Sequence, residues 1–406
     1  MGFIYRLAVF LVIFEGIIIQ CEGTGGETSR KRIQNAPNID AGVDEQLFPN
    51  DVIELIISKT DFETIRDAVR EFVVPPNNIV MSRILQDYII YIAPKLNERM
   101  HGNYYYGGES FLTIGSYMDM EGLNSFFNEF GDQVKKIAIY LGEDRDIDIQ
   151  SDSDTQSDSD ILSEEIIHIF KKYAKNFEDL RIEEIYHDRF WNGISDGEDG
   201  ILFPEVKKFQ IEGEIIRNQF KLNSIFPKLE SFTLVGSIAD GNCLENVRGL
   251  KQFALDTDSI REDQLDGIFK NNKNLTMICL KMPNRTETMD SIAKHLTKLK
   301  TLKVQSPGVN FMLRSIDSAV HELPLVTQFG MLFHEMNDIF GIENLSFDMP
   351  HLKKLTLNGN QSDYRIINFI QHFEDLEILE LYLSEHNPVQ FIEKVKHIKE
   401  INDIFL

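Results

Sequence analysis

The chain has 406 residues, 42% of them hydrophobic, so it is long enough to bury a large core. Its formal net charge is −24, and no basic stripe offsets it, which argues against nucleic acid or an anionic membrane as the main partner. Its three cysteines are too few for the disulfide framework of a small secreted domain.

Residues 1–23 have the pattern of a secretory signal peptide. Arg6 precedes an apolar run from Leu7 to Ile19, and small residues near Gly23 suit cleavage. The run is too short for a comfortable transmembrane helix, so we expect no membrane span after cleavage. Residues 24–45 are rich in glycine, threonine, serine and charge, which predicts a flexible arm.

Residues 46–100 are predicted to form a helical segment. Pro49 precedes Asn-Asp, which is typical of a helix start, and a second short helix is predicted from Thr60. After two prolines, a further helix is predicted over Ile79 to Leu96.

The first two of these helices resemble the opening of an F-box, with a Leu/Phe-Pro start and an apolar first helix. The resemblance implies contacts with the Skp adaptor of a cullin-RING ubiquitin ligase through Pro49, Ile53, Ile56, Ile65 and Val69. The basic pair and tryptophan that usually follow the valine are missing, and Lys59 replaces a customary apolar residue. The alternative is a helical cap that only shields the end of a repeat array from water.

A phrase of the form apolar-x-x-apolar-x-apolar then returns about every 24 residues. It appears as Val134-Ile137-Ile139, Ile182-Ile185-His187, Val206-Phe209-Ile211, Leu229-Phe232-Leu234, Leu250-Phe253-Leu255, Leu275-Ile278-Leu280, Leu299-Leu302-Val304, Val326-Phe329-Met331, Leu352-Leu355-Leu357 and Leu376-Leu379-Leu381, with a partial copy at Ile398-Ile401. The last two apolar positions lie two residues apart and therefore share one face of a strand. Stacked copies bury that face in a continuous core.

Helical spacing, as at Met289, Ile292 and Leu296, follows the strands. The pattern resembles leucine-rich-repeat proteins, which implies an α/β solenoid over residues 101–406. We expect about eleven repeats, a curved parallel sheet inside and helices on the convex side, preceded by the small helical F-box-like cap. The asparagine that usually ends the phrase in that family occurs only as Asn360.

Two segments depart from the repeat. Residues 142–160 include SDSDTQSDSD, which predicts a disordered acidic insert. Trp191, the only tryptophan, precedes an acidic, glycine-rich stretch, and it is either an exposed anchor or packed under a loop.

The concave face is the predicted protein-binding surface. Candidate partner-binding residues on it are Tyr140, Tyr186, Gln210, Thr233, Lys303, Thr356 and Tyr382. Cys279 is predicted to face the same surface and Cys243 the convex half, so a bond between them is not expected. Predicted N-glycosylation sites are Asn274, Asn284 and Asn344, whereas the sequon at Asn360 is doubtful because a ladder asparagine buries its amide.

No phosphate loop, dinucleotide fingerprint, metalloprotease motif or nucleophile elbow occurs. We therefore predict a monomeric recognition protein rather than an enzyme, without cofactor or metal. The order of signal peptide, F-box-like segment and repeats resembles salivary effectors that some plant-feeding insects secrete, which implies secretion, delivery into another organism's cells, and recruitment of ubiquitin ligase. The alternative is a secreted extracellular repeat protein whose N-terminal helices are only a cap.

Overall fold

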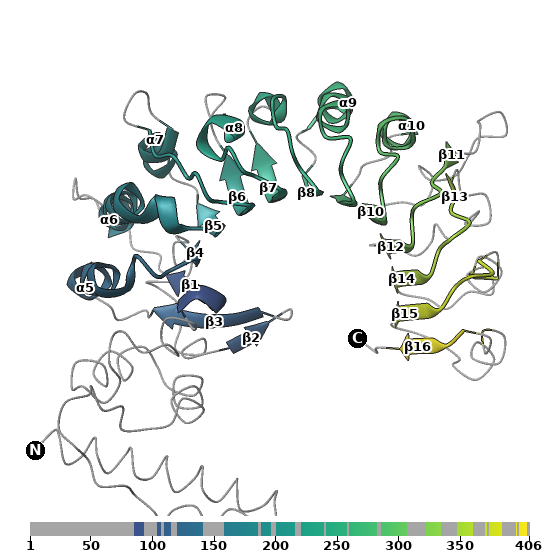
Figure 1. Ribbon diagram of the computed structural model, residues 1–406, viewed down its shortest axis with the longest axis horizontal. Helices are drawn as coiled ribbons and strands as arrows, with labels where there is room; N and C mark the ends of the chain where they lie inside the picture. The colour runs from purple at the N-terminus through teal and green to yellow at the C-terminus, as the bar shows by residue number, and fades with distance from the viewer. Residues whose placement is uncertain are drawn as a thin grey trace, which may run out of the picture. The chain divides into compact units, whose positions relative to one another are not determined.

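The structure is a computed structural model, shown in Figure 1. It describes residues 85–92, 104–106, 109–114, 120–140, 158–185, 188–195, 200–215, 221–238, 241–257, 260–281, 286–306, 321–333, 347–359, 370–371, 373–383, 395 and 398–403. The chain divides into two compact units, Met1–Gln46 and Leu47–Leu406, and all of the described residues belong to the second.

Fourteen of the described strands form one sheet, and all neighbouring pairs except β2 and β3 are parallel. They are β1 (Ile89–Ile92), β2 (Tyr104–Tyr106), β3 (Glu109–Ile114), β4 (Lys136–Tyr140), β5 (Asp179–Ile185), β6 (Lys208–Ile215), β7 (Ser231–Ile238), β8 (Gln252–Asp256), β9 (Met277–Lys281), β10 (Thr301–Ser306), β12 (Gln328–Phe333), β14 (Lys354–Gly359), β15 (Ile378–Leu383) and β16 (Glu400–Asp403). From β4 to β16 they follow one another in chain order, while β11 (His321–Glu322) and β13 (Phe347–Asp348) pair separately. The predicted parallel-sheet solenoid is therefore confirmed.

Helices cover one face of this sheet (Figure 1). They are α5 (Met120–Phe130), α6 (Asp158–Tyr173), α7 (Asp188–Ser195), α8 (Leu222–Ile225), α9 (Glu262–Asn271) and α10 (Thr286–His295), with the short 3-10 helices η2 (Ala174–Asn176) and η4 (Gly241–Leu244). Met289, Ile292 and Leu296 are buried at and just after α10, as their spacing predicts. The last three residues of the predicted insert, 158–160, belong to α6, and residues 142–157 lie outside the described part.

The phrase sets the register of the strands. Ile278 and Leu280 of β9 are buried, and they pair with Leu302 and Val304 of β10. Cys279 lies between them on the opposite face and is half-buried. The same apolar column therefore runs from strand to strand, and each inward side chain gains about 1.5–3 kcal/mol from burial.

The prediction of a helix over Ile79 to Leu96 is wrong at Ile89–Ile92, which form β1. This strand lies between β4 and β3, so the sheet starts earlier in the chain than residue 101, and α5 carries the chain from β3 past β1 to β4. All four residues of β1 are buried. A short run that is apolar on both faces has no period that distinguishes strand from helix.

The predicted phrase Ile182-Ile185-His187 is in the wrong register. Leu180 and Ile182 pair with Ile137 and Ile139 of β4 and point into the core. The true phrase begins at Phe177, which is fully buried against Phe170 at a ring distance of 5.9 Å. Two overlapping apolar spacings exist in this stretch, and the one that starts at Phe177 is the one that the core buries.

Trp191 lies in α7 and is only 1% exposed, so it is not an exposed anchor. It packs edge-on against Phe190, whose ring also contacts Phe170. Aromatic side chains bury a large area, so the packing of Trp191 and Phe190 holds α7 against the core.

Candidate binding surface

The sheet face opposite the helices is called here the open face. It carries the side chains that alternate with the inward positions, three from most strands. Between β4 and β15 its middle row contains Ala138, Arg181, Gln210, Thr233, Ala254, Cys279, Lys303, Gly330, Thr356 and Glu380.

The N-terminal end of the open face is aromatic and partly buried. Ile89, Tyr91 and Ala138 form a small buried cluster there, and Tyr140 packs against it. The hydroxyl of Tyr91 donates a 2.9 Å hydrogen bond to Glu183, so the bond spans from β1 across β4 to β5. These side chains hold β1, β4 and β5 in one arrangement.

Beside this cluster lies a half-buried ion pair within β5. Arg181 contacts Asp179 at 3.3 Å, and their side chains are 14% and 7% exposed. The pair is shielded from solvent more than a surface pair, so removal of either partner leaves a poorly solvated charge.

The C-terminal end of the open face carries a polar cluster. Lys354 contacts Glu380 at 2.7 Å, and the hydroxyl of Thr356 donates to the same carboxylate at 2.9 Å. Burial alone raises the pKa of Glu380, but the bonds from Lys354 and Thr356 hold this pKa below its ordinary value. The carboxylate is therefore ionised at neutral pH.

Lys303 connects this cluster with the middle of the sheet. Its side chain lies across Gly330, where an added Cβ would come within 3.2 Å of the lysine Cγ. Glycine at this position thus lets the exposed ammonium extend from β10 toward β14 and β15.

The middle of the open face contains the ion pair of Asp256 and Lys281, at 2.8 Å. Cys279 lies in the middle row, between Ala254 of β8 and Lys303 of β10. Burial raises the pKa of its thiol, Lys303 lowers it and Asp256 raises it further. The thiol therefore stays protonated at neutral pH, which does not suit a nucleophile.

The structure places most of the predicted partner-binding residues on the open face. Tyr140, Gln210, Thr233 and Thr356 are half-exposed and Lys303 is exposed. Tyr382, in β15, lies beside Asn358 of β14. Tyr186 lies outside the described residues. Their role in binding stays a prediction.

Three residues of this face escaped the sequence analysis. Tyr91 was assigned to a helix, and Arg181 and Glu183 were placed out of register. Phe177 indicates the correct register, because it begins an apolar-x-x-apolar-x-apolar phrase with Leu180 and Ile182.

A second surface, called here the amino rim, consists of the residues that immediately precede the strands. In sheet order they are Lys135, Glu178, Lys207, Glu230, Lys251, Thr276, Lys300, Thr327, Lys353, Glu377 and Lys399. Their backbones are linked in succession, as in the 2.7 Å bond from the Glu178 amide to the Lys135 carbonyl. The position follows the first apolar residue of each phrase, so its alternation of lysine with glutamate or threonine was readable in the sequence.

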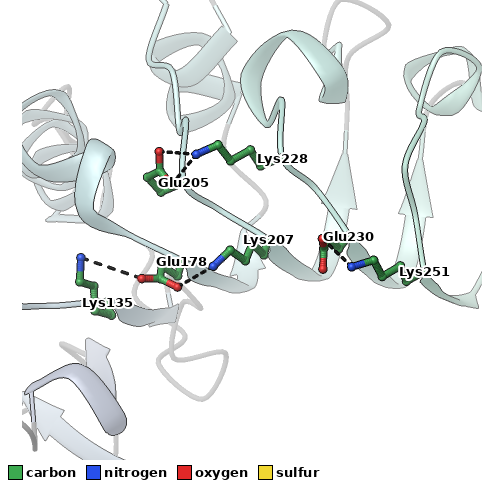
Figure 2. A network of polar contacts seen from close by, with 7 residues as sticks. All are labelled: Lys135, Glu178, Glu205, Lys207, Lys228, Glu230 and Lys251. Atoms are coloured by element: carbon green, nitrogen blue, oxygen red, sulfur yellow. Dashed lines mark hydrogen bonds and ion pairs between the residues drawn. The ribbon is translucent and has the colours of Figure 1, made fainter.

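Ion pairs connect these rungs (Figure 2). Glu178 lies 4.0 Å from Lys135 and 3.0 Å from Lys207, and Lys251 lies 2.7 Å from Glu230. The hydrogen bond with Glu178 raises the pKa of Lys207. Alternating signs favour one stacking register over a shifted one, because a shift by one repeat would bring like charges together.

A shorter row lies beside it, two residues earlier in each repeat. Lys228 contacts Glu205 at 2.6 Å, and its hydrogen bond lowers the pKa of Glu205 (Figure 2). Lys298 donates to Asn274 at 2.7 Å in the same way, three strands farther along.

The helix side has a groove of about 400 Å³ between α5 and α6. Asn124 donates to Glu165 at 2.9 Å and Lys172 to Asn128 at 2.7 Å across it. These bonds join the two helices. Among the residues that line the groove, no set of polar side chains is arranged around a common point as in a ligand site.

Serine, histidine and aspartate meet between α9 and α10. Ser291 donates to Asp266 at 2.6 Å, and His295 lies 3.1 Å from the same oxygen. The carboxylate lies between the hydroxyl and the imidazole, whereas a hydrolase needs the imidazole beside the hydroxyl. The hydroxyl of Ser291, followed by His295, lowers the pKa of Asp266, so the cluster joins two helices as an ionised contact.

One asparagine links neighbouring repeats at the end of α9. Asn272 is 2% exposed, its side chain accepts from the Leu250 amide at 3.0 Å, and it donates to the carbonyls of Val247 at 2.7 Å and Ile268 at 2.8 Å. It satisfies backbone groups of the preceding repeat as well as its own.

The remaining predicted sites are placed as follows. Asn274 is exposed. The adaptor-binding residues Pro49, Ile53, Ile56, Ile65 and Val69 and the sequons at Asn284, Asn344 and Asn360 lie outside the described residues. Cys243 is buried on the helix side, and it forms no disulfide bond with Cys279, as predicted.

Within the described residues, no group of three or more histidine, cysteine, aspartate or glutamate side chains could hold a metal ion. Among the helices of that part of the chain, none is long and apolar enough to cross a membrane.

Comparisons with known proteins add little to this description. No family model and no curated protein matches the sequence. One similar solved structure is the crystal structure of the TLR13-ssRNA13 complex, at 14% identity and a TM-score of 0.27, over 56% of this chain and 38% of that chain. The chain thus spans well under half of that protein, and a TM-score this low does not establish a shared fold or function. The leucine-rich-repeat type of fold rests instead on the phrase, the parallel register and the helices on one face.

Proposed function

We propose that this chain is a recognition protein, not an enzyme, and that it binds a protein partner on the open face. The observation that carries the proposal is the sheet from β4 to β16, whose open face presents half-exposed and exposed polar and aromatic side chains along eleven successive described strands. Stacked repeats use such extended faces for binding.

The chemistry of the face suits a protein rather than a small ligand. Tyr140 offers an aromatic anchor at one end, and Lys303 and the ionised Glu380 offer charges of both signs between the middle and the other end. Aromatic anchors surrounded by polar groups are typical of protein interfaces.

The test is affinity capture with the full chain followed by quantitative mass spectrometry. The open-face variant is Gln210→Glu with Lys303→Glu, and the control is Lys171→Glu with Lys175→Glu, two exposed lysines on the helix side. A partner that the open-face variant loses at least about tenfold, and the control retains, supports the proposal. Equal recovery of every captured protein by both variants would refute it.

We further propose that the F-box-like segment couples this surface to a Skp-type adaptor of a ubiquitin ligase. Support comes from Pro49 to Val69 in the sequence and from the edge of the sheet. The hairpin of β2 and β3 already ends the parallel array with an antiparallel strand. Because a repeat array needs an end cap and a hairpin serves as one, the helices before it are less needed for that purpose.

A pull-down of the mature chain with a Skp-type adaptor tests this coupling, with Ile53→Asp and Ile56→Asp together as the variant. We expect capture by wild type and loss in the variant. If wild type is not captured while a known F-box protein is, the coupling is refuted.

The second candidate is a secreted extracellular binder whose N-terminal helices only cap the repeats. The exposed sequon at Asn274 favours it. Secretion, with or without delivery into another organism's cells, is part of both candidates, so the adaptor pull-down, and not a glycan on Asn274 alone, separates them.

A further inference from the structure

The middle of the amino rim, together with the turns just before it, carries a group of positive charges on a chain whose net charge is −24. Five exposed cations lie on the turns and rungs of three successive repeats, before β8, β9 and β10: Arg248, Lys251, Lys273, Lys298 and Lys300. Lys251 has a carboxylate partner, Glu230 at 2.7 Å, and Lys298 contacts the neutral Asn274. Arg248, Lys273 and Lys300 form no ion pair with another described residue.

These cations lie close together because the repeats stack. The rungs of Lys251, Thr276 and Lys300 are joined by successive backbone bonds of 2.8 and 2.9 Å. Neighbouring strands are about 4.8 Å apart, so the two lysine backbones are about 10 Å apart. Arg248 and Lys273 occupy the same position of adjacent repeats, two residues before Leu250 and Leu275.

An exposed apolar side chain borders the cations. Leu325 is 49% exposed, and Leu202, at 52%, is the other large apolar side chain exposed to this degree in the described residues. Leu325 precedes Val326 as Lys298 precedes Leu299, so the two are neighbours at equivalent positions before β10 and β12. The five cations and this leucine are called here the rim patch: Arg248, Lys251, Lys273, Lys298, Lys300 and Leu325.

We propose that the rim patch is a docking site for a short acidic segment of a protein partner that also carries an aliphatic side chain. The exposed ammonium and guanidinium groups attract carboxylates, and Leu325 contacts the aliphatic residue. This site is separate from the open face, because its residues precede the strands.

The size of the patch favours a peptide over a nucleic acid. Charges on the surface act over about 8–10 Å at physiological salt, so a short segment senses only the cations. A longer polyanion extends beyond three repeats and meets a chain whose net charge is −24. Charge complementarity therefore selects a partner segment about as long as the patch.

The test uses the full chain and a fluorescent peptide rich in aspartate and glutamate with one central leucine, measured by anisotropy. The first variant is Lys298→Glu with Lys300→Glu, and its control is Lys171→Glu with Lys175→Glu, which changes the net charge equally. We expect the patch variant to weaken binding about tenfold or more and the control less than about twofold. Equal weakening by both would show a general charge effect and overturn the proposal.

The apolar contact has its own matched pair. Leu325→Ser should weaken binding by about threefold or more, and Leu202→Ser, at the other exposed leucine, should leave it unchanged. If the two serine variants bind alike, or if a single-stranded oligonucleotide of equal charge binds more tightly than the peptide, the proposal is overturned. Melting curves that match wild type exclude misfolding as the cause of a loss.

Discussion

Replacement of Asn272 by alanine should destabilise the repeat array more than any exposed substitution nearby. The side chain is 2% exposed and makes three hydrogen bonds to backbone groups. Alanine leaves the buried amide of Leu250 and the buried carbonyl of Val247 without this partner. The carbonyl of Ile268 keeps the backbone bond from residue 272, at 3.0 Å.

The magnitude follows from those two orphaned groups. Each buried, unsatisfied group costs about 1–3 kcal/mol, so the free energy of unfolding should fall by about 2–6 kcal/mol. Asn272→Asp should cost more at neutral pH, because a carboxylate can accept from Leu250 but cannot donate to Val247, and its charge is buried.

Equilibrium unfolding in urea, followed by circular dichroism, measures this loss. Asn274→Ala is the control: this exposed asparagine lies two residues away, and its loss should change the free energy by less than about 0.5 kcal/mol. Losses of equal size for the two alanine variants would refute the reasoning. A wild-type-like hydrogen-exchange rate at the Leu250 amide in Asn272→Ala would refute it as well.

Three further predictions concern single contacts. The hydroxyl of Ser291 lowers the pKa of Asp266, so this contact stabilises the fold above the unfolded pKa and is lost as pH falls through the lower folded pKa. The difference in Tm between wild type and Asp266→Asn should therefore shrink below about pH 4. A difference in Tm that does not depend on pH would contradict this. Glu178→Lys removes two ion pairs and should lower Tm by roughly 1–3 °C at low salt and less in concentrated NaCl, whereas Glu129→Lys on α5 should not. Thr288 is 1% exposed and its hydroxyl has no partner in the described atoms, so Thr288→Val should raise the free energy of unfolding by about 1 kcal/mol in urea titrations, and a decrease would show a bond that the structure does not contain.

The core was predictable because burial leaves little choice at the inward positions. Leu275, Ile278 and Leu280 could be assigned from spacing alone, and they are buried as the phrase predicts. The same logic failed at Ile89–Ile92 and around Ile182, for two reasons. A run buried on both faces has no period, and a stretch with two overlapping phrases has two possible registers.

The polar features needed more than the apolar phrase. Asn272 was missed because a ladder asparagine was sought after each strand, whereas it lies before Leu275. The amino rim was visible at one fixed position of each repeat, but its pairing depends on strand order, which only the sheet supplies. Trp191 was ambiguous because sequence alone does not show that α7 covers the core.

Asn274 connects the rim patch with the question of where the protein works. Its exposed amide accepts from Lys298 at 2.7 Å, so a glycan on Asn274 would project from the middle of the patch and cover the lysine. A glycosylated extracellular binder and a chain that docks acidic segments on its rim therefore exclude each other at this position.

Expression in a glycosylating secretory host and in bacteria separates these two states. If peptide mapping locates a glycan on Asn274, we expect the glycosylated chain to bind the acidic peptide about tenfold more weakly than the bacterial one. Asn274→Gln from the secretory host should restore the affinity, because the patch itself is unchanged. Equal affinity of the glycosylated and unglycosylated chains would mean that the peptide does not contact Lys298, and the docking site would then have to lie elsewhere.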